Sequence, residues 1–330
     1  MEVDVREQFG RAKEQLGRII VGQDAAIEEV LCALLAGGHV LVQGVPGVAK
    51  TLLARALAGL LTADYRRIQF TPDLMPADVV GTLLFAPGDS DFRFRPGPIF
   101  TQVLLADEIN RTPPKTQAAL LEAMEEGHVT VDTQTHSLPE LFFVLATQNP
   151  LEYEGTYPLP EAQLDRFLLR VDLGYLEELQ EVEVLRRHLE GFDVRKLDGR
   201  LEAVWTSEDV ASLRAAARTT QLAPAITHYI VQLTAGTRSD PRCLLGASPR
   251  AAIGWMRLAQ VRAAIHGRKF VLPEDVQRFA GPVLRHRLIP TPEAELTEGS
   301  LDELVAEIVA RTPVPGLGEV EAGWAARNAE

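Results

Sequence analysis

Cysteine is scarce in this sequence, and its two residues, Cys32 and Cys243, lie far apart without metal-ligand spacing. We therefore expect core thiols in a reducing compartment, with no disulfide and no cysteine-based metal site. Long apolar runs are also lacking, because no stretch approaches the ~20 residues that cross a bilayer. The first residues contain no basic region followed by an apolar segment, so no secretory signal is predicted. These features predict no membrane insertion and a cytoplasmic location.

Positive charge is in deficit, with 33 Lys and Arg against 46 Asp and Glu and a formal net charge of -13. An acidic chain has no general electrostatic attraction to nucleic acid or anionic membrane, so nucleic acid is not the expected partner. A local basic groove, created for example by oligomerisation, is still compatible with this balance. The chain is rich in apolar residues, 46% of 330, which is enough for a sizeable core and about two domains.

A glycine-bearing segment follows the apolar run of residues 40–42, precedes Leu52 and leads into a predicted helix that starts near Lys50. The order of strand, glycine-bearing loop and helix is typical of a P-loop, which holds the phosphates of a nucleoside triphosphate. The alternative is a chance turn between a strand and a helix. The residues of this loop are Gly44, Val45, Pro46, Gly47, Val48, Ala49, Lys50 and Thr51.

The P-loop residues have distinct predicted roles. Gly44 and Gly47 let the backbone curl so that successive N–H groups face one anion. Lys50 is expected to place its ammonium on the β- and γ-phosphates, and Thr51 to offer a hydroxyl to Mg²⁺. Ala49 stands where the common pattern has glycine. Because alanine disfavours positive φ, we expect a slightly altered loop at this position.

An acidic pair, Asp107 and Glu108, ends the apolar run of residues 103–106. Acids at the carboxyl end of a parallel strand lie where α/β sheets bind ligands. Asp107 is expected to hold Mg²⁺, mainly through water, and Glu108 to polarise an attacking water. The alternative is that both acids simply stabilise the start of the following helix.

Another predicted strand, residues 141–147, runs into Asn149. A polar amide just beyond a central strand could contact the γ-phosphate or the attacking water; the alternative is an ordinary turn residue. Residues 81–98, rich in Gly, Pro and Asp, and residues 128–136 are predicted to form inserted hairpins. The first is expected either to protrude or to pack flat on the body.

The pattern changes from buried strands to helices near residue 195. Residues 1–195 are therefore predicted to form an α/β domain, and residues 196–330 a helical domain with a C-terminal tail. The helices expected in the second half cover residues 207–219, 223–236, 248–265, 273–285 and 300–311. In one of them Ser248 is a good N-cap, and Arg250 projects from the first turn.

Together these motifs resemble an AAA+ ATPase, and more closely the MoxR family, over nearly the whole chain. Ala49 departs from the general P-loop but is similar to the MoxR version. The resemblance implies a P-loop NTPase core, in which helices sandwich a parallel sheet, followed by a small all-α lid domain. The matching phrases are residues 44–51, 105–111, 120–124, 146–150, 159–167 and 246–250.

The resemblance implies further roles. Asn149 matches the sensor-1 residue, and Arg166 matches the arginine finger offered to a neighbour's γ-phosphate. Arg250 matches the sensor-2 arginine, which is expected to report on the nucleotide of its own subunit. The segment around Val21 resembles the part of the family that lines the adenine pocket. ATP and Mg²⁺ are the implied cofactors, and the two hairpins are implied to face partners or a pore.

The resemblance also implies an oligomeric ring, usually a hexamer, that uses ATP to remodel, mature or activate other proteins. The client is expected to include proteins with a von Willebrand factor A domain, which this chain lacks. Three alternative functions are a nucleic-acid motor or loader, an AAA+ subunit of a metal-chelatase complex, and a scaffold that binds nucleotide without hydrolysis. The acidic balance argues against the first alternative. The intact set of Lys50, Asp107 and Glu108 argues against the last.

Overall fold

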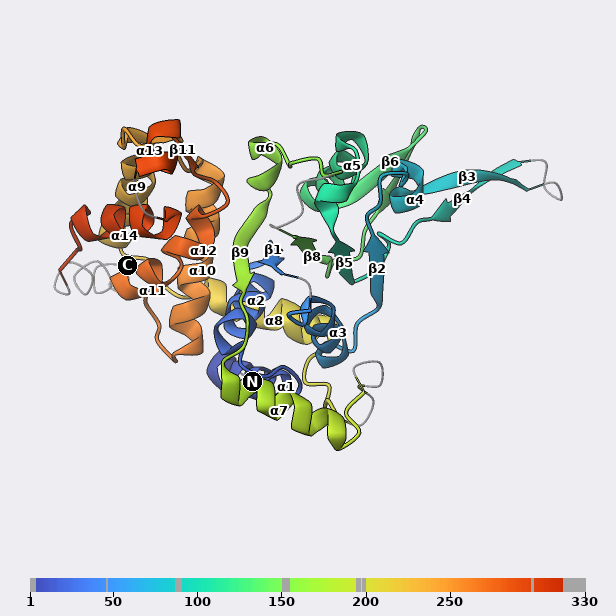
Figure 1. The fold of residues 1–330 in the computed structure, drawn as a ribbon, viewed down its shortest axis with the longest axis horizontal. Helices are drawn as coiled ribbons and strands as arrows, with labels where there is room; N and C mark the ends of the chain where they lie inside the picture. The colour runs from blue at the N-terminus through green and yellow to red at the C-terminus, as the bar shows by residue number, and fades with distance from the viewer. Residues whose placement is uncertain are drawn as a thin grey trace.

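The fold was analysed on a computed structural model of the chain (Figure 1). It describes residues 4–45, 47–86, 91–149, 155–193, 197, 200–297 and 300–316. Pro46 of the predicted P-loop therefore lies outside the described residues, as do part of the predicted linker near residue 195 and the C-terminal tail from residue 317.

A five-stranded parallel sheet forms the centre of the first half, in the order β2-β5-β8-β1-β9. The apolar runs become the inner strands, and every residue of β5 is buried. Because all strands run the same way, their carboxyl ends share one edge of the sheet. The predicted α/β class is confirmed. The strands are β1 (His39–Gly44), β2 (Tyr65–Gln69), β5 (Val103–Asp107), β8 (Phe143–Gln148) and β9 (Phe167–Leu173).

Helices cover both faces of this sheet (Figure 1). In β1, Val40 and Val42 belong to one hydrophobic cluster and Leu41 to the other, as the alternation of a strand requires. The cluster of Val40 contains α1, α2 and α3, and the cluster of Leu41 contains α5. The helices of this half are α1 (Val5–Ile19), α2 (Asp24–Ala36), α3 (Lys50–Leu60), α4 (Pro76–Val80), α5 (Pro114–Glu126) and α6 (Glu161–Leu164). The N-cap of α2 is Gln23, without a side-chain hydrogen bond.

Both predicted hairpins are present: β3 (Gly81–Ala86) with β4 (Asp91–Pro96), and β6 (His128–Val131) with β7 (Gln134–Ser137). The first projects far from the body (Figure 1). Phe85 and Phe92 near its end are 55% and 61% exposed. At its base, the Phe94 ring stacks on His136 with centroids 3.8 Å apart, so the two hairpins contact each other.

The second half is helical, with two very short strands. The predicted helix at 273–285 is interrupted at the fully buried Phe279, and the sequence analysis missed α13 and both strands. The first half ends with α7 (Glu178–Leu189). The elements of the second half are α8 (Ser207–Arg218), α9 (Pro224–Ser239), β10 (Cys243–Leu245), α10 (Pro249–Ile265), α11 (Pro273–Arg278), α12 (Ala280–Leu284), β11 (Ile289–Pro290), α13 (Pro292–Thr297) and α14 (Leu301–Arg311).

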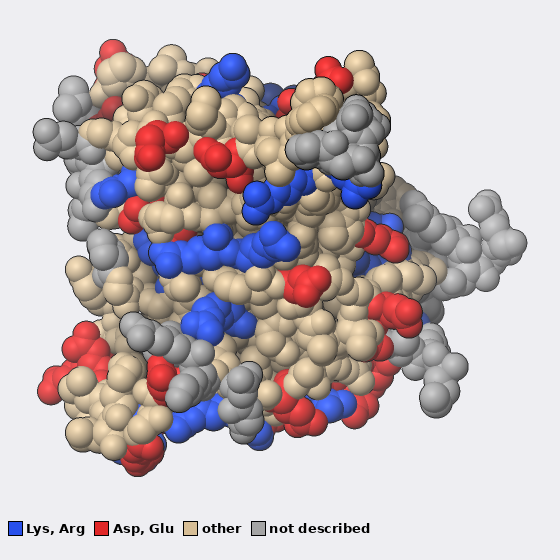
Figure 2. Space-filling view, turned by 90° about the vertical axis from the view of Figure 1, so that its right-hand side faces the viewer, with Lys and Arg blue, Asp and Glu red and all other residues tan. Residues whose placement is uncertain are grey.

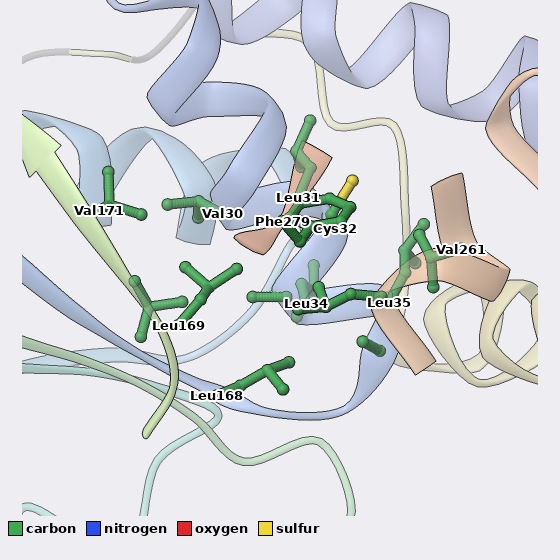
Figure 3. Packing of buried hydrophobic residues seen from close by; sticks show 14 of the residues in the cluster. Val30, Leu31, Cys32, Leu34, Leu35, Leu168, Leu169, Val171, Val261 and Phe279 are labelled. Atoms are coloured by element: carbon green, nitrogen blue, oxygen red, sulfur yellow. The ribbon is translucent and has the colours of Figure 1, made fainter. Parts of the chain in front are cut away.

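Helix α2 joins the two halves, because it is apolar on nearly all sides and is buried between them. Figure 3 shows Leu31 and Leu34 of α2 among Leu169 of β9, Phe279 and Val261. One hydrophobic cluster therefore runs from the sheet into the helical half. An apolar contact surface of this kind holds the second half in a fixed position against β9.

A buried ion pair fixes the same junction near the start of β9. The Arg287 guanidinium, with a side chain 3% exposed, donates to Asp165 at 2.7 Å. It also donates to the backbone carbonyls of Phe167 and Leu168. Ser248 Oγ donates to the other Asp165 oxygen at 2.7 Å. Because Asp165 precedes β9, these contacts place the start of α10 beside the amino end of the sheet.

Candidate functional site

The predicted P-loop connects β1 to α3 at the carboxyl edge of the sheet. Gly47 has a φ of 89°, which glycine adopts easily. Ala49 has a φ of 64° and is the N-cap of α3. The expectation of an altered loop at Ala49 is therefore wrong, because alanine adopts the left-handed conformation that glycine normally supplies. This conformation costs about 1–2 kcal/mol for a residue with a Cβ.

The loop is arranged to receive an anion. Lys50 Nζ donates to the Gly44 carbonyl at 2.8 Å, which holds the ammonium over the loop. Gly44 is required where it stands, because a Cβ there would lie 2.7 Å from the Leu173 carbonyl oxygen of β9. Among the described residues, no side chain caps the start of α3, and the N-terminus of a helix favours an anion such as phosphate. Thr51 is partly exposed in the first turn of α3, and Leu52 is packed beneath it.

Asp107 ends β5 at the same edge of the sheet and is 7% exposed. Its Oδ1 accepts a 2.5 Å hydrogen bond from the Thr147 hydroxyl of β8. Its Oδ2 accepts two from the Arg67 guanidinium of β2, at 3.0 Å and 2.7 Å. Both neighbouring strands therefore hold this carboxylate in place.

Glu108 follows Asp107 and has a φ of 57°, a strained left-handed conformation of the kind found at functional sites. Its backbone N–H donates to Thr147 Oγ1 at 2.9 Å, and its Oε2 accepts from Gln69 Nε2 at 2.7 Å. The partly exposed Arg111 lies 3.3 Å from the same oxygen. The Glu108 side chain therefore contacts β2 and Arg111, and it does not cap the short 3-10 helix Ile109–Arg111 that follows it.

The sequence analysis missed Arg67, Gln69 and Thr147, which orient the two acids. Arg67 and Gln69 alternate on β2, and Thr147 is the last but one residue of β8. These three residues lie on β2 and β8, the two strands that flank β5. Their contact with the acids can be predicted only when the strand order is known.

Asn149 follows β8 directly and is 5% exposed. Because β8 lies between β5 and β1, the structure brings Asn149 to the same edge as Asp107, Glu108 and Lys50. Val21 lies further along this edge, next to Gly22 and Gln23. Gln23 Nε2 donates to the Gly174 carbonyl just after β9, which ties the segment to the end of that strand.

Arg166 and Arg250 lie together at the opposite edge of the sheet. Arg166 directly precedes β9, and its Nε donates to Glu125 of α5 at 2.8 Å. Arg250, in the first turn of α10, donates to the other oxygen of Glu125. The hydrogen bond from Arg250, helped by the Arg166 charge, lowers the pKa of Glu125. The two guanidiniums thus share one carboxylate and one patch of surface.

The end of α5 that carries Glu125 is fixed to the amino end of β1. His39, the first residue of β1, contacts the Met124 carbonyl through Nε2 at 3.2 Å and accepts from the Val144 N–H through Nδ1 at 3.1 Å. Burial lowers the pKa of His39 to about 4, so the imidazole is neutral at pH 7 and Nε2 donates. The amino end of β1 is five residues from Gly44, or about 16 Å at ~3.3 Å per residue.

The expectation that Arg250 serves its own subunit's nucleotide does not fit this geometry. Arg250 is held at Glu125, about the length of a strand from Lys50 of the same chain. The cause is the docking of α10 beside Asp165 at the amino end of β9, through Ser248. Arg250 and Arg166 therefore lie on the same patch of surface, at the amino edge of the sheet.

The donors at the carboxyl edge suit a hard divalent cation. The described residues contain no cluster of three or more His, Cys, Asp or Glu side chains that could hold a metal alone. A carboxylate from Asp107 and a hydroxyl from Thr51 are instead the sparse oxygen set typical of Mg²⁺, which keeps water and phosphate ligands. These residues fit a Mg²⁺–nucleotide complex.

Comparison with known proteins agrees with this geometry. A family model described as the ATPase family associated with various cellular activities (AAA) matches residues 39–169, and an AAA lid domain model matches residues 235–308. The chaperone MoxR1 of Mycobacterium tuberculosis is 39% identical over 94% of this chain and 83% of its own length. This chain belongs to the MoxR family of AAA+ ATPases.

Two further similarities extend over nearly the whole chain. Protein YeaC of Bacillus subtilis is 47% identical over 94% of this chain and 96% of its own length. The crystal structure of a candidate ATPase from Cytophaga hutchinsonii has a TM-score of 0.86 at 38% identity and covers 94% of this chain and 96% of its own. The MoxR-family fold, with its helical lid, therefore extends over nearly the whole chain.

Proposed function

We propose that this chain hydrolyses ATP with Mg²⁺ at sites that form between two copies. The observation that carries the proposal is the division of the charged residues between opposite edges of the sheet. Lys50, Asp107 and Glu108 lie at the carboxyl edge, and Arg166 and Arg250 at the amino edge, joined by Glu125. One chain cannot direct both groups at the same phosphate, but two chains in a head-to-tail arrangement can.

The residues at the carboxyl edge bind and orient. Lys50 and the N–H groups of the loop hold the phosphates, and Thr51 and Asp107 hold Mg²⁺, which neutralises phosphate charge when bound. Glu108, oriented by Gln69, accepts a proton from the attacking water, and Asn149 positions that water. Arg166 of the neighbouring copy stabilises the charge of the transferred phosphoryl group, and Arg250 contacts the same phosphate.

We further propose a closed ring, with six copies as the expected number, that remodels or activates client proteins in the cytoplasm. Among the described residues, no helix is both long and apolar enough to cross a bilayer. The name of one relative supports the client role in part, because that protein is called a chaperone. A von Willebrand factor A domain protein remains the proposed type of client, and residue 195 the proposed domain boundary.

The projecting β3–β4 hairpin is the proposed client-contacting element. Figure 2 shows the face of the molecule on that side, with Lys and Arg side chains in a band across its middle. On the described part of the hairpin, Arg93 and Arg95 are exposed, as are Leu84, Phe85 and Phe92. Apolar and cationic side chains in one element suit a protein segment that offers both kinds of contact.

The rate of ATP hydrolysis per copy is expected to rise steeply with protein concentration, because active sites are complete only between copies. Steady-state phosphate release, measured from dilute to concentrated protein, tests this. Glu108→Gln is the matched control and is expected to stay inactive at every concentration while still binding nucleotide. A specific rate that is flat down to concentrations at which sedimentation shows a monomer contradicts the proposal.

A further inference from the structure

Helix α7 is amphipathic, but its apolar side faces outward. Its polar residues Gln180, Glu183 and Arg187 are partly buried, and Arg187 donates to the Arg18 carbonyl of α1 at 2.6 Å. None of its residues is buried, and four large apolar side chains lie on the exposed side. These are Leu179, 82% exposed; Val182, 56%; Leu185, 66%; and Leu189, 90%. The spacing of three, three and four residues puts them on one helix face, the α7 stripe.

A stripe of this size is unusual on a surface that stays in water. Each fully buried aliphatic side chain contributes about 1.5–3 kcal/mol, so four exposed ones are a substantial driving force for association. Figure 1 shows α7 at the lower edge of the view, at the outer surface of the molecule. The stripe is therefore available to a second molecule.

The first turn of α7 adjoins the proposed nucleotide pocket. A Cβ on Gly22 would lie 2.3 Å from Gln180 Oε1 and 2.9 Å from Leu176 Cδ2, so the segment of Val21 packs directly on the start of α7. The strand that leads to α7 also touches the P-loop, through Leu173 and Gly44. A second copy of the chain that contacts the phosphates in this pocket would therefore lie close to α7.

A complementary surface lies beside Arg250. On α10, Arg250, Ile253 and Arg257 are exposed at positions i, i+3 and i+7, which share one helix face. Ile253 is 50% exposed, and Leu244 and Leu245 of β10, which precedes α10 in the chain, are 67% and 45% exposed. We call this set the lid stripe. On α10 the apolar Ile253 lies between the two guanidiniums.

We infer that the lid stripe of one copy packs on the α7 stripe of the next. This inference rests on the proposed function, because the copy that delivers Arg166 and Arg250 to the phosphates carries the lid stripe with it. The α7 stripe adjoins the nucleotide-binding residues at the carboxyl edge, and the lid stripe adjoins the two arginines at the amino edge. Bringing the two edges of neighbouring copies together therefore also brings the two stripes together. The contact is head-to-tail, with different surfaces on the two copies.

Charge is compatible with this pairing. The first turn of α7 carries the exposed carboxylates Glu178 and Glu181, and Arg186 is exposed further along the helix. The exposed Arg257 of the lid stripe supplies a cation that can meet the acids of the first turn.

Thiol cross-linking between separately prepared variants tests the pairing. Cys243→Ser removes the half-buried thiol near the lid stripe, whereas Cys32 is fully buried and is retained. Leu185→Cys and Ile253→Cys proteins in this background are mixed with a non-hydrolysable ATP analogue and a short bis-maleimide. A covalent dimer is expected in the mixture and not with either variant alone. Val314→Cys, 54% exposed and outside both stripes, replaces Ile253→Cys as the control.

Assembly supplies the second readout. Leu185→Asp is expected to raise the concentration that gives half-maximal ATPase rate by about tenfold or more, since it removes one buried leucine and adds a charge. Nucleotide affinity of the variant is expected to be unchanged, and Val314→Asp to behave as the parent. Two results contradict the pairing while leaving the proposed ring intact, provided that the ATPase rate of the parent depends on protein concentration. One is the absence of a covalent dimer in the mixture, and the other is a dimer formed by Leu185→Cys alone. If the parent does not assemble, the pairing and the proposed function both fail.

Discussion

Replacing Arg166 with alanine is expected to lower the maximal rate of ATP hydrolysis by ~10³-fold or more, the effect of removing an arginine finger supplied in trans. Nucleotide affinity is expected to stay within about threefold of the parent, because Arg166 contacts Glu125 and not the P-loop of its own chain. The physical reason is that Arg166 lies at the amino edge of the sheet, the length of β1 away from the P-loop of its own chain. Its loss therefore lowers the rate of hydrolysis without weakening nucleotide binding.

Single-turnover hydrolysis and binding of a fluorescent nucleotide analogue measure the two quantities separately. Arg18→Ala is the matched control, since Arg18 is an arginine on α1 that pairs with Glu14 at 2.6 Å and is 58% exposed. Its removal is expected to leave both quantities unchanged. A normal rate for Arg166→Ala at saturating nucleotide shows that Arg166 is not the finger.

Replacing Lys50 with alanine is expected to remove hydrolysis and also to weaken nucleotide binding. A hydrogen bond to a charged group contributes about 1.5–3 kcal/mol, which corresponds to roughly 10–100-fold in affinity. The 2.8 Å contact with the Gly44 carbonyl shows that the Lys50 ammonium already points over the loop, so little rearrangement accompanies binding. Arg166→Ala and Lys50→Ala therefore differ in binding although both lose the reaction.

Titration with a fluorescent nucleotide, followed by phosphate-release assays at saturation, checks the Lys50 prediction. Lys269→Ala, a change of an exposed lysine in the helical half, is the control for the loss of one positive charge. If Lys50→Ala binds nucleotide with the affinity of the parent, the phosphates do not lie on the predicted loop.

Much of the sheet could be predicted, because each inner strand is a short apolar run. The acids and amide that follow these runs were predictable for the same reason, since parallel strands end at one edge. The partners of Asp107 were not predictable. Arg67 and Thr147 reach it only because β2 and β8 flank β5, and strand order is not encoded by any local pattern.

Helix α7 and the lid show a second limit of sequence reasoning. Periodicity does not tell which side of α7 faces the protein, and in the structure partly buried polar side chains face α1. The position of Arg250 has a similar cause, because the lid is docked by Ser248 and Arg287 on Asp165. Such long-range contacts join residues more than 80 positions apart and leave no local signal.

The most direct test of a site shared between copies is to mix the two inactive variants. Lys50→Ala retains Arg166, and Arg166→Ala retains the P-loop, so an interface between them contains one complete site. With equal amounts in random head-to-tail order, about a quarter of the interfaces are complete, and we predict that fraction of the parent rate. A mixture that remains as inactive as its components, while sedimentation shows that the variants assemble together, contradicts the account.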